Sequence, residues 1–505
     1  MEKLMEQIAN INSVINDFVW VKVGLIVLLG GGLLMTLVTR VFQLSYIGHW
    51  WKETIGSIFK KDSEATKKTD KKTITQFQSL CTALAATIGT GNIAGVSAAI
   101  VIGGPGAVFW MWIAAFLGMM TKYSETVLGI YYRRRNSDGE WSGGPMYFLR
   151  DGLGSKKGFK FIGSALAFLF AIFAILASFG IGNMGQVNKI TLNLQSAFFK
   201  DVDLGAVGSI PVINLIIGLA LMVLTALIVI GGLQRIASFA EKVVPVMAIA
   251  YIIGAMVVFF VNIENVGIMF ASIFRFAFGI KAVAGGAAGV AIAQVITQGC
   301  KRGIFSNEAG LGSSVMVHAS SNVKEPVKQG MWGIFEVFFD TFVVCTMTAI
   351  VVLSSGAINL ETGLPFDPNL NDATLVSQVF GDIFGKAGEI FIALAILFFA
   401  FTTVVGWSQY GSKAVEYLCG RKGVKVYKVI FVLMIISGAV MTSSLAWDIS
   451  DTFNGLMMIP NLIGVAALCP LVSKLTRNYI NRKIKNKDEA PMLSYNPETE
   501  KEMSK

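Results

Sequence analysis

The sequence predicts an all-α protein that crosses a membrane many times. Of its 505 residues, 54% are hydrophobic and only 15% are charged, whereas soluble domains carry about 25% charged residues. Eleven apolar segments are each long enough to cross a bilayer, which takes about 20 helical residues. Glycine-rich stretches interrupt two of these segments. We therefore predict a polytopic bundle of about eleven transmembrane helices, two of them broken.

The eleven predicted spans follow one another in order along the chain. They lie at about residues 19–42, 78–102, 106–131, 160–186, 210–231, 240–262, 267–300, 329–355, 387–417, 427–445 and 453–473. Lysine and arginine concentrate in the loops after the odd-numbered spans and in the tail, and cytoplasmic loops are the ones enriched in these residues. We therefore expect a multi-pass protein of the cell membrane with its N-terminus outside and its C-terminus in the cytoplasm.

The net charge of +10 raises the question of a nucleic-acid partner. The basic residues fall in short segments between apolar spans, however, and membrane orientation explains that placement. The partner that the sequence predicts on these grounds is the lipid bilayer, with no nucleic acid.

The first interrupted span carries Gly89, Gly91 and Gly95 in its middle. Backbone groups freed inside the hydrocarbon core need partners, so a break is tolerated only where it is buried in protein or lines a wet cavity. We expect such a cavity here, and with it the function. The alternative is that the three glycines only allow neighbouring helices to pack closely, as small residues often do in membranes.

The second interruption falls in the seventh span, at Gly285 and Gly286. Transporters with inverted repeats bind their substrate where one helix of each half is broken. With the first span set aside, the two broken spans open consecutive blocks of five helices that have opposite orientation. The predicted parts are an N-terminal segment at 1–77, repeats at 78–262 and 263–474, and a basic cytoplasmic tail at 475–505.

Several motifs occur in one order across the predicted core. They are GTGNIAG at 89–95, GGPGAVFWMW at 103–112, GGPMY at 143–147, GNMGQ at 182–186, RGIFSNEAGLGS at 302–313, DT at 340–341 and GW at 406–407. Together they resemble the alanine or glycine:cation symporter family, of the sodium:alanine symporter type, within the amino acid–polyamine–organocation superfamily. The resemblance implies a LeuT-type five-plus-five fold. It also implies sodium-coupled, sometimes proton-coupled, uptake of a small neutral amino acid by alternating access.

A zwitterionic amino acid needs partners for a carboxylate and an ammonium. Exposed N–H groups at the N-terminus of a half-helix can bind the carboxylate, and freed carbonyls can bind the ammonium or a hard cation. The residues expected to contact the substrate are Gly89, Thr90, Gly91, Asn92, Gly285, Gly286 and Ala287 at the breaks and, by the resemblance, Gln186 and Trp407. The alternative for Gln186 and Trp407 is that they only seal a helix interface.

The sodium site is expected from the resemblance. Its ligands would be the carbonyl oxygens of Ala85 and Ile88 and the hydroxyls of Thr402 and Thr403. The alternative for the two threonines is a hydrogen bond to their own helix backbone, which is common in membrane helices.

The family pattern also bears on which amino acid is carried. Many members that handle alanine or glycine have an aromatic residue directly after the paired glycines of the second break, where this chain has Ala287. A smaller residue there predicts a larger pocket. A small substrate would leave a void in that pocket and lose contacts with its lining, whereas a longer substrate side chain could fill it. We therefore expect glutamine to rival alanine and glycine as the substrate.

Four ionisable residues fall in or beside apolar spans. Asp340 and Glu336 lie one turn apart, and such groups are functional candidates by default; for Asp340 the sequence leaves open coupling, a proton site or a structural role. Arg302 and Glu308 are expected at the cytoplasmic end of the second break, as an inner gate or a static ion pair.

No nucleophile–base constellation, nucleotide loop or cysteine–histidine metal motif is visible in the sequence. We therefore predict a protein that is not an enzyme and has no cofactor, with sodium, or alternatively a proton, as the coupling ion. An ion channel is the alternative from another class, because broken helices and their carbonyls also build selectivity filters.

Overall fold

The computed structural model describes residues 2–60, 63–67, 70, 72–208, 210–279, 288–367, 370, 372–441 and 445–504. These residues form a bundle of helices with two short antiparallel hairpins, β1–β2 (Arg134–Arg135, Trp141–Ser142) and β3–β4 (Ala206–Val207, Ile210–Pro211). Six of the described helices are long and apolar enough to cross a bilayer, or up to eight if each of two bent helix pairs is one span. The predicted all-helical, polytopic fold is confirmed.

Helices occupy all eleven predicted spans. Helix α1 (Glu2–Asp17) precedes the first span. The first seven spans contain η1 and α2 (Phe18–Gly24, Leu25–Val38); α6, η2 and α7 (Gln76–Thr87, Gly91–Gly95, Val96–Gly103); α8 (Ala107–Tyr131); α10, η4 and α11 (Lys160–Phe179, Gly180–Met184, Gly185–Phe198); α12 (Val212–Val229); α13 (Gly232–Val261); and α14 with α15 (Val266–Ala277, Ala288–Asn307). The last four contain α17, η7 and α18 (Pro326–Val337, Phe338–Cys345, Thr346–Ser354); α20 (Lys386–Val440), which covers two spans; and α21 with α22 (Leu445–Ala467, Cys469–Lys483).

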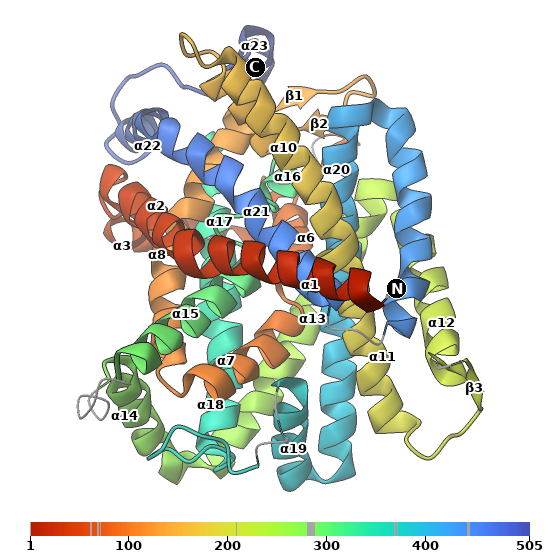
Figure 1. The fold of residues 1–505 in the computed structure, drawn as a ribbon. Helices are drawn as coiled ribbons and strands as arrows, with labels where there is room; N and C mark the ends of the chain where they lie inside the picture. The colour runs from red at the N-terminus through yellow and green to blue at the C-terminus, as the bar shows by residue number, and fades with distance from the viewer. Residues whose placement is uncertain are drawn as a thin grey trace.

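Shorter elements connect these spans. They are α3 (Phe42–Ser45), α4 (Ile47–Glu53), α5 (Ile55–Ile58), α9 (Pro145–Tyr147), η3 (Phe148–Leu153), η5 (Ile263–Asn265), α16 (Val315–His318), α19 (Asp372–Phe384) and α23 (Pro497–Ser504). The C-terminus and the β1–β2 hairpin lie at one end of the molecule, and α14, α18 and α19 lie at the other (Figure 1).

The first broken span is bent by 55° between its two halves. Helix α6 begins with a capping box, in which the Thr75 hydroxyl accepts from the Gln78 N–H and the Gln78 side chain accepts from the Thr75 N–H. That arrangement satisfies N–H groups that the first turn leaves unpaired. After Thr87 the chain leaves helical geometry and resumes at Gly91 as a π-turn, η2. The predicted break therefore lies at Ile88–Thr90.

The ninth and tenth predicted spans are two helices that meet at Gly420 and are labelled together as α20. Gly420, with φ 66° and ψ −171°, is the residue with non-helical backbone angles inside this range. Residues with a side chain are strained at such angles. The chain turns back there, since a side chain on Gly411 would meet Tyr427. The two predicted spans are therefore separate helices, and the turn between them is made at a glycine.

The broken helix lies in the middle of the bundle. Helix α6 contacts α13 on one side and α20 on another, while α8 packs against α15 and α17. Helices α1 and α2 cross the outside of the bundle against α21, and α2 also contacts α8 (Figure 1). The peripheral position of the first span agrees with its being set apart from the two predicted repeats.

Candidate substrate and sodium site

Side chains from neighbouring elements satisfy the backbone freed at the break. The Gly89 N–H donates to the Asn92 side-chain oxygen at 2.9 Å, and the Asn92 N–H donates back to the Gly89 carbonyl at 3.2 Å. Thr90 donates through its N–H and its hydroxyl to the Gln186 side-chain oxygen, at 3.4 and 3.0 Å. Gln186 begins α11 just after the π-turn η4. The structure thus brings Gln186 onto the break, as the resemblance implies.

The two threonines of α20 face different neighbours. The Thr403 hydroxyl lies 3.5 Å from the Ile88 carbonyl oxygen and 3.0 Å from a carbonyl oxygen of its own helix. The Thr402 hydroxyl donates to the same carbonyl at 2.9 Å and faces the Met247 sulfur at 3.6 Å. Ala85 is buried in α6, close to Ile88. Of the expected sodium ligands, the structure brings Ile88 and Thr403 together and turns Thr402 toward α13.

A small cavity opens at the break. Its lining residues come from both sides of the break, from η4, α11, α15, α20 and α21, and from the residue that follows α15: Ala86, Thr87, Gly89, Gly91, Ile181, Gln186, Phe305, Glu308, Thr403, Trp407 and Asn454. Its volume is about 10 Å³, the room for roughly one water molecule. An amino acid is larger, so substrate binding requires these side chains to move apart.

Glu308 lines this cavity, although the sequence analysis places it at an inner gate. Helix α15 ends at Asn307, and Glu308 then adopts a left-handed conformation with φ 55° that reverses the chain. The carboxyl is 3% exposed, accepts from the Ser313 hydroxyl and interacts with the Trp407 side chain. A non-glycine residue held in this region is strained, and such strain clusters at functional sites. Glu308 therefore brings a carboxylate to the break.

The remaining predicted substrate residues lie in three places. Gly91 and Trp407 line the cavity, and Trp407 packs so closely on Gly182 that a side chain at 182 would overlap its ring. Asn92 points away from the cavity and donates to Asp340 at 2.7 Å. Gly285, Gly286 and Ala287, where the sequence predicts the second break, lie outside the described residues.

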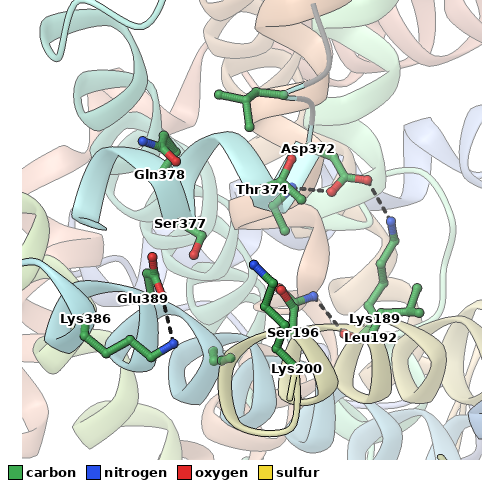
Figure 2. Close-up of a pocket in the computed structure, with 15 residues that line it drawn as sticks. Lys189, Leu192, Ser196, Lys200, Asp372, Thr374, Ser377, Gln378, Lys386 and Glu389 are labelled. Atoms are coloured by element: carbon green, nitrogen blue, oxygen red, sulfur yellow. Dashed lines mark hydrogen bonds and ion pairs between the residues drawn. The ribbon is translucent and has the colours of Figure 1, made fainter. Parts of the chain in front are cut away.

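A second cavity of about 420 Å³ lies between α11, α19 and α20, toward the end of the molecule opposite the C-terminus. Its walls are charged, and Figure 2 shows Lys189 reaching Asp372 and Lys386 reaching Glu389, at 2.7 and 3.2 Å. Lys189 lies one turn after Gln186 on α11. No residue of the first break lines this cavity, so it is separate from the candidate site.

A helix broken at mid-bundle, with its freed backbone held by side chains from other spans and a carboxylate beside it, defines a secondary transporter of the LeuT-type fold. The protein is a multi-pass membrane transporter and not an enzyme. The profile of the sodium:alanine symporter family matches residues 5–493. The chain belongs to this family of sodium-coupled amino-acid symporters.

Similar proteins agree with that assignment. The chain is 40% identical to the sodium/alanine symporter AgcS of Methanococcus maripaludis over 475 residues, which covers 94% of this chain and 98% of that protein. It is 34% identical to the probable sodium/glutamine symporter GlnT of Bacillus subtilis over 492 residues, with 97% and 93% covered. The crystal structure of MhsT in complex with L-phenylalanine shares the fold at 14% identity, with a TM-score of 0.51 over 81% of this chain and 99% of that chain.

Proposed function

We propose that this protein couples sodium entry to the uptake of a small neutral amino acid by alternating access. The observation that carries the proposal is the cavity at the break, which Gly89, Gly91, Glu308 and Thr403 line. The Thr403 hydroxyl lies 3.5 Å from the Ile88 carbonyl oxygen. The substrate carboxylate binds at the N-terminus of η2, where the helix dipole favours negative charge. The ammonium binds at Glu308, and sodium binds at Ile88 and Thr403, with Ala85 and Thr402 as the further proposed ligands.

Uptake of labelled amino acids into proteoliposomes tests this function. A sodium gradient is expected to drive accumulation of alanine or glutamine, and equal sodium on both sides is expected to allow only equilibration. Accumulation driven by a pH gradient without sodium would favour the proton-coupled alternative. Sodium current in the absence of any amino acid would favour a channel.

We further propose that the N-terminus is outside and the C-terminus is cytoplasmic. The support is the basic loops and tail, which gather at the end of the molecule that carries α23 and the β1–β2 hairpin. Cys419 is the exposed cysteine at that end. A membrane-impermeant thiol reagent that labels Cys419 in intact cells would contradict this orientation.

Thr403→Val is expected to raise the half-saturating sodium concentration for uptake more than Thr402→Val does. Thr403 faces the Ile88 carbonyl, whereas Thr402 faces Met247. Losing an interaction with a charged group costs about 1.5–3 kcal/mol. This corresponds to an increase of roughly tenfold or more in the half-saturating sodium concentration. Both replacements keep the side-chain shape, so each variant is the matched comparison for the other. An unchanged half-saturating sodium concentration in Thr403→Val would mean that sodium does not bind between Ile88 and Thr403.

Glutamine is proposed as a substrate beside alanine. Asn454 lines the cavity, is 1% exposed, and its side-chain oxygen has no hydrogen-bond partner among the described residues. An unpaired buried acceptor is costly, and the carboxamide of glutamine can donate to it. Relatives include both a sodium/alanine and a probable sodium/glutamine symporter.

Unlabelled glutamine is expected to compete with labelled-alanine uptake. Asn454→Leu should weaken competition by glutamine more than transport of alanine, because the methyl group of alanine needs no donor or acceptor. Ala287→Phe should also weaken competition by glutamine more than transport of alanine, because the phenyl ring would fill the enlarged pocket that the sequence predicts. If glutamine neither competes with alanine nor is transported by the parent protein, the enlarged-pocket proposal is wrong.

A further inference from the structure

A third cavity, of about 230 Å³, lies between the end of α2, the short helix α3 and α22. Helices α2 and α22 are in contact, and both lie at the side of the bundle in Figure 1. Arg40, Arg477 and Lys485 line this cavity, and its described lining residues include no aspartate or glutamate. It shares no lining residue with the substrate cavity. It is therefore a separate, basic cavity.

The basic side chains of this cavity have no protein partner among the described residues. Arg40, Arg477 and Lys485 form no ion pair there, and their side chains form no hydrogen bond there. The hydroxyl of Tyr46, which also lines the cavity, is likewise without a hydrogen bond to a described residue. The cavity therefore offers four side-chain donors, three of them positively charged.

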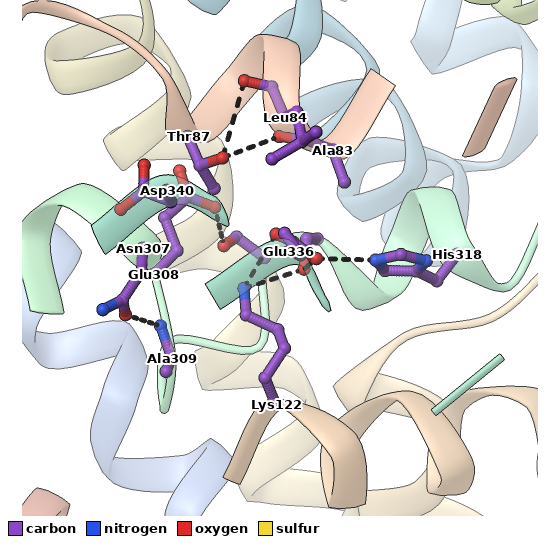
Figure 3. A network of polar contacts seen from close by, with 12 residues as sticks. Ala83, Leu84, Thr87, Lys122, Asn307, Glu308, Ala309, His318, Glu336 and Asp340 are labelled. Carbon is purple, nitrogen blue, oxygen red and sulfur yellow. Dashed lines mark hydrogen bonds and ion pairs between the residues drawn. The ribbon is translucent and has the colours of Figure 1, made fainter. Parts of the chain in front are cut away.

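Other cations of the protein have acidic partners. Lys122, inside the bundle, lies 3.2 Å from Glu336 (Figure 3). Arg482, on the same helix as Arg477, pairs with Glu325 through two hydrogen bonds of 2.8 and 2.9 Å. The contrast between the two arginines of α22 indicates that the partner of Arg477 is not a protein carboxylate.

One carboxylate lies close to the cavity. Asn481 is a lining residue, and its side-chain amide donates to Glu489 at 2.6 Å. Glu489 also accepts from the Asn478 amide at 3.4 Å and does not line the cavity itself. The three basic side chains therefore stay uncompensated by the groups around them.

The chain makes a strained turn at the edge of this cavity. Arg40 and Val41 have left-handed backbone angles, with φ 59° and 55°. Such angles are uncommon outside glycine, and for a β-branched valine they are an outlier. The turn ends α2 and brings Ser45 and Tyr46 to the same cavity as Arg40. Strain of this kind clusters at functional sites and ligand clamps.

The cavity lies where α2 reaches the membrane surface. The last turns of α2 expose Leu33, Leu34 and Leu37, of which Leu37 is 62% exposed. On a peripheral membrane helix such side chains contact lipid chains, and basic side chains at the helix end reach the headgroup layer. Helix α22 is bent by 59° from α21. By the orientation proposed above, this is the surface of the cytoplasmic leaflet.

We propose that this cavity binds the phosphate group of an anionic phospholipid. Guanidinium groups match phosphate oxygens through paired N–H donors, and basic pockets on the cytoplasmic side of membrane helices bind anionic headgroups. Arg40 and Arg477 hold the phosphate, Lys485 and the Tyr46 hydroxyl are further donors, and the acyl chains lie along the exposed leucines of α2. The lipid thereby joins the peripheral helix α2 to α22.

Native mass spectrometry of the purified full-length protein in detergent tests this site, because it counts bound lipids and does not depend on transport. Dioleoylphosphatidylglycerol and dioleoylphosphatidylcholine have the same acyl chains but differ in net charge. The parent protein is expected to bind its first phosphatidylglycerol roughly tenfold more tightly than phosphatidylcholine. Equal affinity for the two lipids would overturn the proposal, whatever the outcome of the transport assays.

Arg40→Gln combined with Arg477→Gln is expected to weaken phosphatidylglycerol binding by about 25-fold, because each basic residue at an anionic surface contributes about fivefold. Binding of phosphatidylcholine should not change. The matched control is Lys422→Gln combined with Lys474→Gln, which removes the same charge from exposed lysines that do not line the cavity. This control should keep the affinity of the parent. Unchanged binding in the arginine variant, or an equal loss in the control, would overturn the site.

Inorganic phosphate and glycerol 3-phosphate in excess distinguish a lipid from a soluble phosphate ester. Both lack acyl chains, so neither is expected to displace phosphatidylglycerol from the parent protein. Displacement by either compound would overturn the lipid and assign the cavity to a soluble phosphate ester. If the double arginine variant does not fold, Arg40→Gln and Arg477→Gln alone are each expected to weaken binding about fivefold, and no change in either would overturn the site.

Discussion

Gly89→Ala is expected to reduce sodium-driven uptake to near background. A methyl group on Gly89 would lie 2.5 Å from the Thr403 hydroxyl and 3.4 Å from the Gln186 side-chain oxygen. The first distance is too short for any contact between these atoms, so the Thr403 side chain or the backbone of the break must shift. Overpacking of this kind costs about 1–3 kcal/mol, and here it distorts the substrate cavity and the proposed sodium site together. We expect a loss of roughly 10- to 100-fold in initial uptake rate.

The matched control for this variant is Gly30→Ala. Nothing lies within 4 Å of the position that a methyl group on Gly30 would take, and Gly30 belongs to the peripheral helix α2. Gly30→Ala is therefore expected to keep the uptake rate of the parent. Normal insertion and purification of Gly89→Ala would exclude misfolding, and near-normal uptake by it would return Gly89 to a role in helix packing alone.

Glu308→Gln is expected to raise the KM for amino acid by about 10- to 100-fold. The replacement keeps the size of the side chain but removes the negative charge that faces the substrate cavity. A hydrogen bond to a charged group is worth about 1.5–3 kcal/mol, and each 1.4 kcal/mol corresponds to about a tenfold change in affinity. Concentration-dependent uptake at saturating sodium measures this change.

Two comparison variants separate ammonium binding from a structural role. Glu308→Asp keeps the charge and should retain more affinity than Glu308→Gln, whereas a purely structural carboxylate held by Ser313 would be disturbed by shortening as much as by neutralisation. Glu361→Gln, an exposed glutamate outside the cavity, should behave as the parent. An unchanged KM in Glu308→Gln would exclude Glu308 from substrate binding.

The sequence predicted the membrane-spanning helices of this protein because their positions depend on hydropathy. Long apolar segments become helices, and the glycine run at 89–95 breaks one of them at Ile88–Thr90. The resemblance, rather than any pattern within α11, predicted Gln186 as a residue of the substrate site. The structure has its side chain beside Thr90. The two spans on either side of Gly420 were also predictable from hydropathy, whereas the shortness of the turn between them was not, because one glycine with φ 66° makes it.

The chemistry of the cavity was harder to predict. Glu308 follows a helix whose end cannot be located to within one turn from hydropathy, and one left-handed residue decides whether its carboxyl faces the cytoplasm or the break. Asn454 lies far along the chain in α21, and nothing in its neighbourhood marks it as a cavity residue. The different directions of Thr402 and Thr403 depend on helix rotation, which adjacent identical residues cannot reveal.

The π-turns η2 and η7 also constrain the length of the chain. A π-turn holds one residue more than the α-helical turn it replaces, so deleting one residue from 91–95 would remove the bulge around Asn92 and leave the rest of α7 near its present register. Deleting a residue from α7 itself would instead rotate every later residue of that helix by about 100° and move it by about 1.5 Å. The same reasoning applies to 338–345, where Asp340 lies. Insertions and deletions that surface loops accept with little cost would here remove a bulge or change the register of a half-helix, so these two stretches tolerate substitution more readily than any change in length.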